Sequence, residues 1–438
     1  MSTPDTYTSW GRVHRPRQIV CPLRWRHEPL PPCDAPSRLP RGRGRSYGDC
    51  CLNDGGALLP TMALDHFIAF DAEQGILRAE AGVTLDAILR LSVPRGWFLP
   101  VTPGTRFATL GGAIANDVHG KNHHADGTFG RHVTRLELLR SDGSRMECSP
   151  QENADWFAAT VGGLGLTGLV TWAEIRLRRI ASSEMEQQQL RFANLDEYLS
   201  IAAESDAEWT YTVAWVDCLS SGSKLGRGVL FRGRHAESGP LEMPEAPRRL
   251  AVPVDLPFSL VNGASLRLFN ALYYRGHPTR TRSQRMPFLP FFYPLDGIAN
   301  WNRLYGRRGL YQFQCVIPQG QETAMHEILA RIARSGQGSM LAVLKRFGDR
   351  PSPGMLSFPR PGLTLALDFA NRGEPTRRLL GELEQVTLQA GGTLYPAKDA
   401  LMRPETFHKG YPRWQEFSAF RDPAFSSSLW RRVTGESA

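Results

Sequence analysis

Short apolar runs separated by turn residues set the pattern of residues 57–177. The runs at 57–62, 66–71 and 76–82 predict three strands. Residues 84–93 carry apolar side chains at helical spacing behind Thr84, which can cap a short helix. Two further strands are expected at 133–139 and 169–177, with a hairpin turn at 141–144 and a helical turn at 155–159.

The pattern changes after about Arg179. Helices are expected at 195–204, 321–335 and 376–390, the last ended by Gly391 and Gly392. Residues 236–290 are rich in Pro and Arg, with a weakly amphipathic stretch at 255–274. Because a chain of 438 residues is too long for one hydrophobic core, we expect two domains, which can be interleaved along the sequence. Strands are predicted at 185–190, 209–216, 311–317, 341–347, 364–369 and 393–395.

The net charge of +9 is partly local, because residues 1–50 hold nine Arg against four acidic residues. Such an excess favours anionic partners, such as nucleotide phosphates, phosphorylated substrates or an acidic membrane surface. The sequence has no basic region with heptads, no zinc-finger spacing and no RNA-recognition signature. We therefore expect no nucleic-acid partner.

Seven cysteines are scattered along the chain without CxxC spacing. This fits neither a secreted disulfide framework nor a structural zinc site and indicates a reducing compartment. The N-terminus lacks the apolar core of a signal peptide, and no window reaches 18 apolar residues. We expect a cytoplasmic protein, with peripheral contact to the inner membrane left open.

Two glycine-rich loops are candidates for chemistry. Residues 103–124 (PGTRFATLGGAIANDVHGKNHH) place glycines around an apolar run, which can form a buried strand or a first helical turn, and end in three histidines. Glycine lets backbone N–H groups approach a phosphate or a flat ring, so this loop is either a cofactor cradle or a metal site. The histidine spacing matches no standard zinc motif, so no metal is expected.

The other loop, residues 42–48 (GRGRSYG), has neither the Rossmann spacing nor a Walker lysine. It offers closely spaced N–H groups together with Arg43, Arg45 and Ser46, which suit a pyrophosphate. A basic surface turn is the alternative. A third glycine cluster at 160–168 could by itself be a tight packing turn.

Taken in order, GRGRSYGD, PGT, GGAI, HGKNHH and TVGGLGLTG resemble flavoproteins of the vanillyl-alcohol-oxidase type, and most of all the decaprenylphosphoryl-ribose 2′-oxidases. The resemblance continues through FFYPLDGIANWNRLYG, YQFQCVIP, LKRFGD, LSFPRPG and GGTLYPAKDALMRPETFHKGYPRW and covers most of residues 40–415. It implies an α+β fold, in which a two-subdomain FAD-binding domain carries an inserted substrate domain built on an antiparallel sheet flanked by helices. The implied boundaries are 1–183 for the FAD-binding domain, 184–392 for the substrate domain and 393–438 for a C-terminal return.

The resemblance also implies roles for single residues. Arg45 lies near the place where many relatives attach FAD through a histidine, so the flavin is expected to be non-covalent. Lys398 in YPAKD matches the essential active-site lysine and is assigned to the flavin N1/O2 edge or the substrate hydroxyl. His119 is the candidate for proton transfer or flavin positioning. FAD is expected to contact Arg43, Gly44, Arg45, Ser46, Tyr47, Gly48, Pro103, Gly104, Thr105, Thr109, Gly111, Gly112, Asn116, His119, Gly120, Gly165 and Tyr395. The sugar is expected to contact Tyr47, Lys121, Gln312, Gln314, Lys345, Thr364 and Lys398.

The implied activity is FAD-dependent oxidation of a secondary hydroxyl, the 2′-hydroxyl of polyprenyl-phosphate-linked ribose, to a keto sugar. A short-chain reductase would complete an epimerisation toward arabinofuranose. The sequence departs from the family at Thr364 and Ala366, where Asn and Cys are expected, so the sugar stays open. Two alternatives remain: a soluble alditol or aldonolactone oxidase, and a flavin- or lipid-binding accessory protein without turnover. Basic residues near 275–285 could meet a lipid tail and acidic headgroups, or form only a basic loop.

Overall fold

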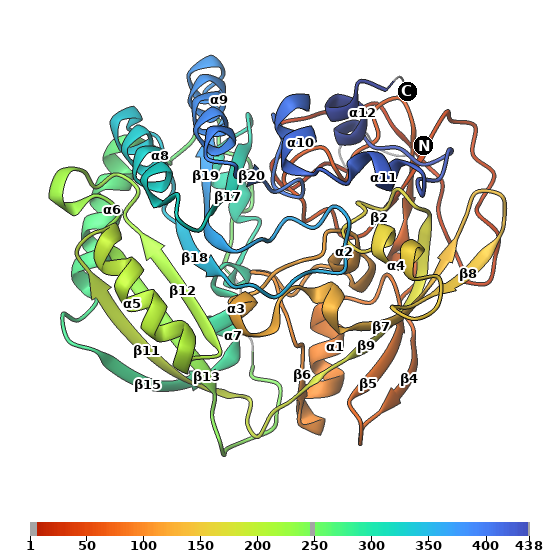
Figure 1. The fold of residues 1–438 in the computed structure, drawn as a ribbon, viewed down its shortest axis with the longest axis horizontal. Helices are drawn as coiled ribbons and strands as arrows, with labels where there is room; N and C mark the ends of the chain where they lie inside the picture. The colour runs from red at the N-terminus through yellow and green to blue at the C-terminus, as the bar shows by residue number, and fades with distance from the viewer. Residues whose placement is uncertain (1–6, 246–249, 437–438) are drawn as a thin grey trace.

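The computed structural model describes residues 7–245 and 250–436, so the first six residues of the N-terminal lead-in and the last two residues lie outside it. Two lobes stand side by side, and both ends of the described chain belong to the same lobe (Figure 1). That lobe contains residues 7–180 and the C-terminal helices, whereas the middle of the chain forms the other lobe.

An antiparallel five-stranded sheet forms the centre of the first lobe, in the order β4-β5-β9-β7-β8. Its core side packs on α1 (Leu85–Ser92), which begins where Thr84 accepts a hydrogen bond from the N–H of Ala87. A smaller parallel sheet, β1-β3-β2, lies beside it. The strands are β1 (Ile19–Val20), β2 (Arg38–Arg41), β3 (Ala57–Pro60), β4 (Phe67–Asp71), β5 (Ile76–Glu80), β7 (Val133–Leu139), β8 (Arg145–Cys148) and β9 (Leu169–Arg176).

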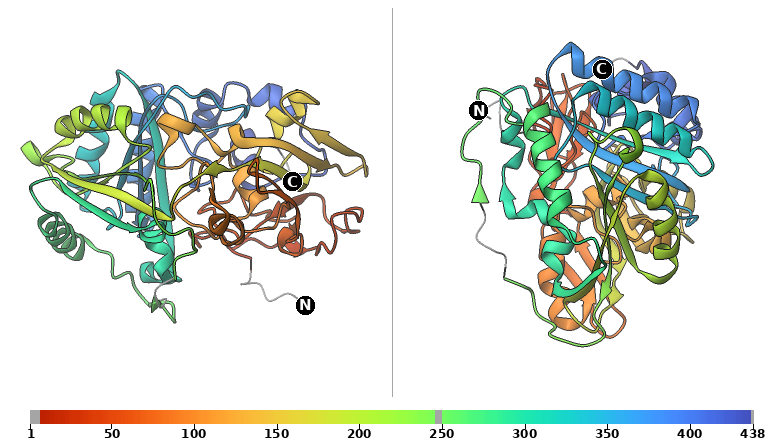
Figure 2. Two further views of the ribbon diagram at one scale, coloured as in Figure 1. Left: turned by 90° about the horizontal axis from the view of Figure 1, so that it is seen from below. Right: turned by 90° about the vertical axis from the view of Figure 1, so that its left-hand side faces the viewer.

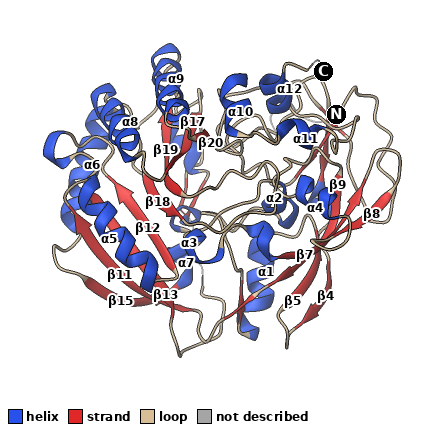
Figure 3. Cartoon of the chain, in the orientation of Figure 1, coloured by secondary structure: helices blue, strands red, loops and turns tan. Residues whose placement is uncertain are grey.

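The second lobe is built on an antiparallel eight-stranded sheet in the order β15-β11-β13-β12-β18-β19-β17-β20. Three helices, α5 (Leu195–Glu208), α8 (Glu322–Ser335) and α9 (Glu374–Gln389), cover its outer face (Figure 3). The strands are β11 (Glu184–Phe192), β12 (Tyr211–Val216), β13 (Gly228–His235), β15 (Arg282–Pro287), β17 (Leu310–Pro318), β18 (Val343–Phe347), β19 (Gly362–Ala370) and β20 (Thr393–Leu394).

Strict alternation along β17 and β19 gives this sheet two different faces. Phe313 and Cys315 of β17 pack into the core under the helices, as do Leu365 and Leu367 of β19. The residues between them point the opposite way, because successive side chains of a strand alternate between the faces. That second face carries Gln312, Gln314, Ala366 and Asp368, and it is turned toward the first lobe.

The C-terminal segment returns to the first lobe after β20. It contains α10 (Pro404–Gly410), α11 (Trp414–Ser418) and α12 (Ser428–Thr434), which lie beside the N-terminal strands in Figure 1. Arg432 of α12 forms ion pairs with Asp49 (2.8 Å) and Asp399 (2.9 Å) and so joins the two ends of the chain. The chain therefore has to be nearly complete before this lobe can close.

Most predicted elements are confirmed, including all three long helices and the hairpin turn between β7 and β8. The apolar run between the glycines is a helix, α2 (Leu110–Ala115). Within the weak stretch at 255–274, only α6 (Gly263–Gly276) is helical, because Asn262 and Ser265 form a capping box. The helical turn expected at 155–159 is confirmed as α4 (Ala154–Thr160). The sequence analysis missed the C-terminal helices and the elements β1, β2, β8, β13, β15, β6 (Trp97–Phe98), β10 (Arg178–Arg179), β14 (Leu250–Ala251), β16 (Ile298–Ala299), α3 (His123–Asp126) and α7 (Phe288–Phe292).

The expectation that the cysteines form no disulfide is wrong for one pair. Cys21 and Cys33 are joined by a disulfide that closes a loop in the irregular lead-in. Cys21 follows β1 and packs with Leu59 and Phe425, and the chain then folds back to bring Cys33 to the same cluster. The spacing did not indicate this pair because the fold-back depends on contacts with the C-terminal segment. The other five cysteines are free thiols.

No helix among residues 7–245 and 250–436 is both long enough and apolar enough to cross a membrane.

Candidate active site

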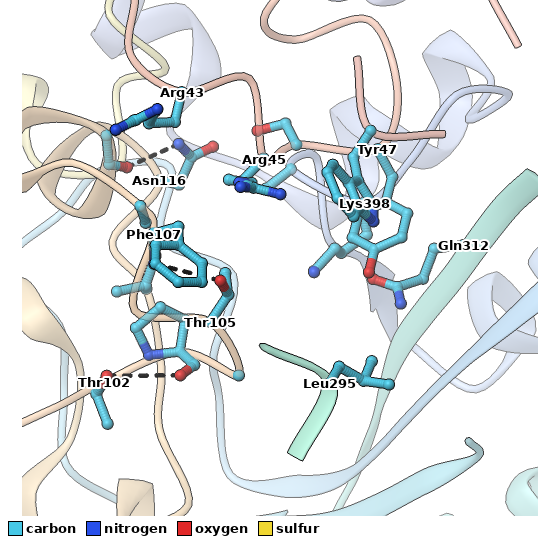
Figure 4. A pocket seen from close by; sticks show the side chains of 18 of the residues that line it. Arg43, Arg45, Tyr47, Thr102, Thr105, Phe107, Asn116, Leu295, Gln312 and Lys398 are labelled. Atoms are coloured by element: carbon cyan, nitrogen blue, oxygen red, sulfur yellow. Dashed lines mark hydrogen bonds between the residues drawn. The ribbon is translucent and has the colours of Figure 1, made fainter. Parts of the chain in front are cut away.

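A cavity of about 620 Å³ lies between the two lobes. One wall is formed by the glycine loops at 42–47 and 103–120, and the other by the inner face of the eight-stranded sheet. Figure 4 shows Arg43, Arg45 and Asn116 at one end of this space, with Tyr47, Lys398 and Gln312 together at the other. Residues that the sequence separates by more than 300 positions therefore face one space.

The first glycine loop is held from both ends of the chain. Gly44 adopts a positive φ of 60°, which glycine tolerates without strain. The N–H of Trp10 donates to the carbonyl of Ser46 (2.8 Å), and the N–H of Tyr47 donates to the carbonyl of Ala397 (3.0 Å). Arg45 lies 4.3 Å from the ring centre of Trp10. The loop thus presents backbone and guanidinium groups on a fixed frame.

The second glycine loop ends in α2. The hydroxyl of Thr109 accepts a hydrogen bond from the N–H of Gly112 (3.2 Å), which starts the helix. Gly42 of the first loop lies so close to Thr109 that a Cβ there would collide with its side chain. Asn116 donates to the carbonyl of Gly112 (2.8 Å), while its own Oδ1 is buried without a hydrogen-bond partner. Such an orphaned acceptor indicates that a donor from a bound group belongs there.

The opposite wall is polar and tightly connected. Gln312 lies directly across the ladder from Asp368, and its amide donates to the carboxylate (2.7 Å). Gln314 donates to the hydroxyl of Thr364 (3.1 Å) and lies 2.9 Å from Nε2 of His119. These side chains hold one another in place, as polar groups in a partly buried wall must.

Three half-buried lysines face the cavity. Lys398 lies 4.2 Å above the ring centre of Tyr47, and Lys345 donates to the carbonyl of Gly120 (3.2 Å). Lys121 donates to the carbonyl of Phe291. Burial lowers the pKa of Lys398 to about 8 and the pKa of Lys121 and Lys345 to about 7, so their ammonium groups gain from a bound anion.

His119 stands between these lysines and the glutamines. Its Nε2 lies 2.9 Å from the amide nitrogen of Gln314, and its Nδ1 lies 3.1 Å from the amine of Lys345. A neutral imidazole has one N–H and one lone pair, so it can accept a hydrogen bond from only one of these two donors. Burial, followed by the charges of Lys345, His123 and Lys398, lowers the pKa of His119 well below its usual value. Burial beside these lysines therefore favours the neutral form of the ring.

All but two of the predicted site residues line the cavity; the exceptions are Gly48 and Thr364. Gly48 packs against the carbonyl of Asp399, where no side chain would fit, and so supports the loop from behind. Thr364 is buried beneath Gln314. The neighbouring histidines do not line the cavity. His123 packs on the ring of Phe347, and Nε2 of His124 lies 2.9 Å from the carbonyl oxygen of Trp209. No cluster suited to a metal ion occurs among the described residues.

Several lining residues were missed. Trp10, Phe107 and Trp301 belong to loops without periodicity, so no sequence pattern marked them. Asp296 ties its loop to the second glycine loop by accepting from Thr105 (2.7 Å) and the N–H of Arg106 (2.9 Å). Among these missed residues, only Asp368 could have been found from the sequence. The alternating pattern of LTLALD places it on the same face of the strand as Thr364 and Ala366.

Comparison with known proteins identifies the family. A family model described as FAD binding domain matches residues 37–149. Over 411 residues, the chain is 37% identical to the decaprenylphosphoryl-beta-D-ribose oxidase of Mycolicibacterium smegmatis, an alignment that covers 90% of this chain and 88% of that enzyme. The chain belongs to the vanillyl-alcohol-oxidase-type FAD flavoproteins. This flavoprotein is also 34% identical over 372 residues to an uncharacterized protein in the mprA 5′ region of Streptomyces coelicolor, covering 80% of this chain and 100% of that one. A match to the Delta(24)-sterol reductase of Homo sapiens, 36% identical over 107 residues, covers 24% of this chain and 21% of that enzyme.

The flavoprotein is an FAD-dependent oxidoreductase, and its cavity suits that cofactor. The two glycine loops meet at Gly42 and Thr109, leaving backbone groups open toward the space. The buried Oδ1 of Asn116 needs a donor, and the lysines around the cavity are stabilised by negative charge. A dinucleotide with a pyrophosphate and a polar ring edge supplies both.

Proposed function

We propose that this flavoprotein oxidises the 2′-hydroxyl of a polyprenyl-phosphate-linked ribose to a ketone, as the first half of an epimerisation toward arabinofuranose. The observation that carries the proposal is the set of lysines and glutamines that line the cavity beside the cofactor loops, in a chain similar over nine-tenths of its length to decaprenylphosphoryl-beta-D-ribose oxidase. Ammonium groups suit a sugar phosphate, and carboxamides suit sugar hydroxyls.

The glycine-loop wall is proposed to bind FAD without a covalent bond. Backbone N–H groups of residues 42–47 and 104–112, with Arg43 and Arg45, would hold the pyrophosphate. Asn116, His119 and Tyr395 would contact the remaining chain and ring. The predicted FAD-binding domain (1–183 with 393–438) and substrate domain (184–392) follow from this division, since the former carries these loops.

Bound FAD supplies the acceptor for the hydride of the alcohol carbon. Lys398 is proposed to place its ammonium group where negative charge develops at the edge of the ring. His119 is assigned a positioning role, because its ring lies within hydrogen-bond distance of both Gln314 and Lys345. Gln312, Lys121 and Lys345 would then orient the sugar and its phosphate.

Peripheral contact with an acidic membrane is the proposed route for the lipid tail. Six of the ten exposed large hydrophobic side chains in the described residues lie between 250 and 272, including Leu250 (71% exposed) and Phe258 (67%). The segment is continuous with the cavity, because β14 pairs with β16, whose Ile298 and Ala299 line it. The right-hand view of Figure 2 shows α6 on the outside of the second lobe, which is built on the eight-stranded sheet. A lipid-linked sugar could pass from the bilayer into the cavity along this surface.

A short-chain reductase is the proposed partner, because a keto sugar must be reduced on the other face to complete an epimerisation.

The decisive experiment is anaerobic flavin reduction. Purified holoenzyme is mixed with polyprenyl-phosphate ribose, free alditols and aldonolactones, and loss of the oxidised flavin band is recorded. Bleaching by the lipid-linked ribose alone supports the proposal. Bleaching only by free sugars would favour the soluble-oxidase alternative, and no bleaching by any of them would leave a binding protein. Flotation with anionic and neutral vesicles tests the membrane contact.

A further inference from the structure

Asp368 is a buried carboxylate that the proposed mechanism has not used. It lies on β19, is only 2% exposed and lines the cavity. One oxygen accepts a hydrogen bond from Gln312 (2.7 Å), and no other hydrogen bond to this carboxylate occurs in the described part of the chain. An acid buried with one engaged oxygen is unusual, because burial of a charge costs free energy unless partners compensate it.

The position of Asp368 relates it directly to the proposed site. It interacts electrostatically with Lys398 and with Tyr47, whose ring lies beneath the lysine amine. No ion pair within 4.0 Å joins Asp368 to a cation among residues 7–245 and 250–436. The carboxylate therefore faces the same end of the cavity as Lys398 without being neutralised by direct contact.

Oxidation of an alcohol releases a proton, and the other side chains of the cavity are poor acceptors for it. His119 is surrounded by lysines, which disfavour an imidazolium ion. Asp296 has both oxygens engaged, one by Thr105 and the other by the N–H of Arg106. A lysine that neutralises a bound anion is already protonated, so it cannot accept the proton. Asp368 is the remaining group with a lone pair to offer.

We propose that Asp368 is the proton acceptor for the substrate hydroxyl, an inference that rests on the proposed alcohol oxidation. The O–H bond breaks and its proton moves to the carboxylate of Asp368, which becomes a neutral acid. The C–H bond of the same carbon breaks, and its hydrogen leaves with the electron pair as a hydride. FAD would be the oxidant that accepts this hydride, and the carbon–oxygen single bond becomes the double bond of a carbonyl. Lys398 retains its charge throughout.

The environment of Asp368 suits this role. Burial raises its pKa to about 7, while the Gln312 amide and Lys398 act in the opposite direction. A general base works best when its pKa lies near the working pH. Neutralisation of this acid also relieves the burial of its charge, so proton uptake is favoured at the moment the hydroxyl ionises.

The first test is Asp368→Asn in the FAD-loaded protein. In anaerobic mixing with polyprenyl-phosphate ribose, wild-type bleaching is expected to rise with pH through a midpoint near 7. The variant should bleach about 10²–10⁴-fold more slowly and lose that midpoint. FAD content and the visible spectrum, measured in the same samples, should match wild type. Asp296→Asn is the matched control, because it removes the other buried carboxylate of the cavity and should keep the midpoint.

Two further measurements keep the test decisive. Infrared difference spectra of substrate-free protein between pH 6 and 8 should show a protonated carboxyl band that Asp368→Asn removes. Gln312→Met removes the hydrogen-bond donor that stabilises the charged form of Asp368. The pH midpoint of bleaching and the pH midpoint of the infrared band should therefore both rise by about one pH unit. The inference would be overturned if Asp368→Asn bleached at the wild-type rate or kept the wild-type pH midpoint of bleaching. If Asp368→Asn fails to hold FAD, the inference would be overturned by a Gln312→Met variant whose pH midpoint is the same as in wild type. If no sugar bleaches wild type, the proposed function fails, whereas the infrared band still reports the titration of Asp368.

Discussion

The cavity wall formed by the glycine loops presents mostly backbone, whereas the wall formed by β17, β18 and β19 presents long polar side chains. The first wall is shaped by close approach, as where Gly42 meets Thr109. The second is shaped by strand register, as where Gln312 faces Asp368. Backbone groups suit a cofactor that is the same in every turnover, while side chains can be exchanged to change the substrate. A change in the first wall should therefore alter cofactor binding, and one in the second should alter chemistry.

Lys398→Met gives the largest expected effect. Lys398 contacts the first loop only through the ring of Tyr47, and methionine keeps that apolar contact, so the protein should stay yellow. The rate of flavin reduction should fall about 10³-fold with loss of the charge that stabilises the transition state. Stopped-flow absorbance in the absence of oxygen measures this rate. Lys409→Met, on the exposed end of α10, is the control and should reduce at the wild-type rate. Loss of FAD together with activity in Lys398→Met would contradict the division between the walls.

Gly42→Val tests the backbone wall. The added side chain would push Thr109 and α2 away from the first loop, so FAD affinity should fall about 100-fold, equivalent to about 2.7 kcal/mol. Fluorescence titration of the apoprotein with FAD gives the Kd. Gly381→Ala in α9 has open space around its Cβ position and should leave the Kd unchanged while stabilising the helix by about 0.5–1 kcal/mol. Equal Kd values for the two variants would show that the loops need not approach so closely.

Asp117→Ala tests the connection between the walls. Asp117 accepts hydrogen bonds from Ser352 (2.5 Å), Ser357 and the N–H of Gly130 (2.8 Å), and so fastens the β18–β19 loop to the residues before His119. Leaving these donors unpaired should lower the free energy of unfolding by about 2–3 kcal/mol. Ser352→Ala should cost about 1 kcal/mol, since it removes one of three bonds. Denaturant unfolding of both variants measures the difference, and similar values would refute the shared connection.

The smallest effect is expected from Lys345→Met in the apoprotein. Burial lowers the pKa of Lys345 to about 7, far below the ordinary value for lysine. Between pH 7 and about 10.5 the unfolded chain thus binds more protons than the folded one, so wild-type stability should rise with pH in this window. The variant should lack this rise, and the difference in Tm between the two proteins should shrink by a few degrees from pH 7 to pH 10. A constant difference across this range would mean that Lys345 is not desolvated by the folded wall.

Sequence reasoning reached the backbone wall more easily than the side-chain wall. Glycines at fixed spacing mark close approach wherever they occur, so residues 42–47 and 103–112 could be predicted before their partners were known. The importance of Asp368 depends on which strand lies beside β19, and pairing register is a tertiary property. The same reason explains Thr364, which was expected to contact the sugar but lies covered by Gln314 from the neighbouring strand.

The hydrogen bond from Tyr47 to Ala397 has a consequence for the order of events during synthesis. The first glycine loop leaves the ribosome early, but the residues that hold it in place, and the lysine above it, come from the last part of the chain. A nascent chain that ends before residue 397 has neither the support for this loop nor the C-terminal helices beside β2. Flavin capture must therefore await synthesis of residue 397 and the helices after it, and fragments that stall earlier should emerge without colour.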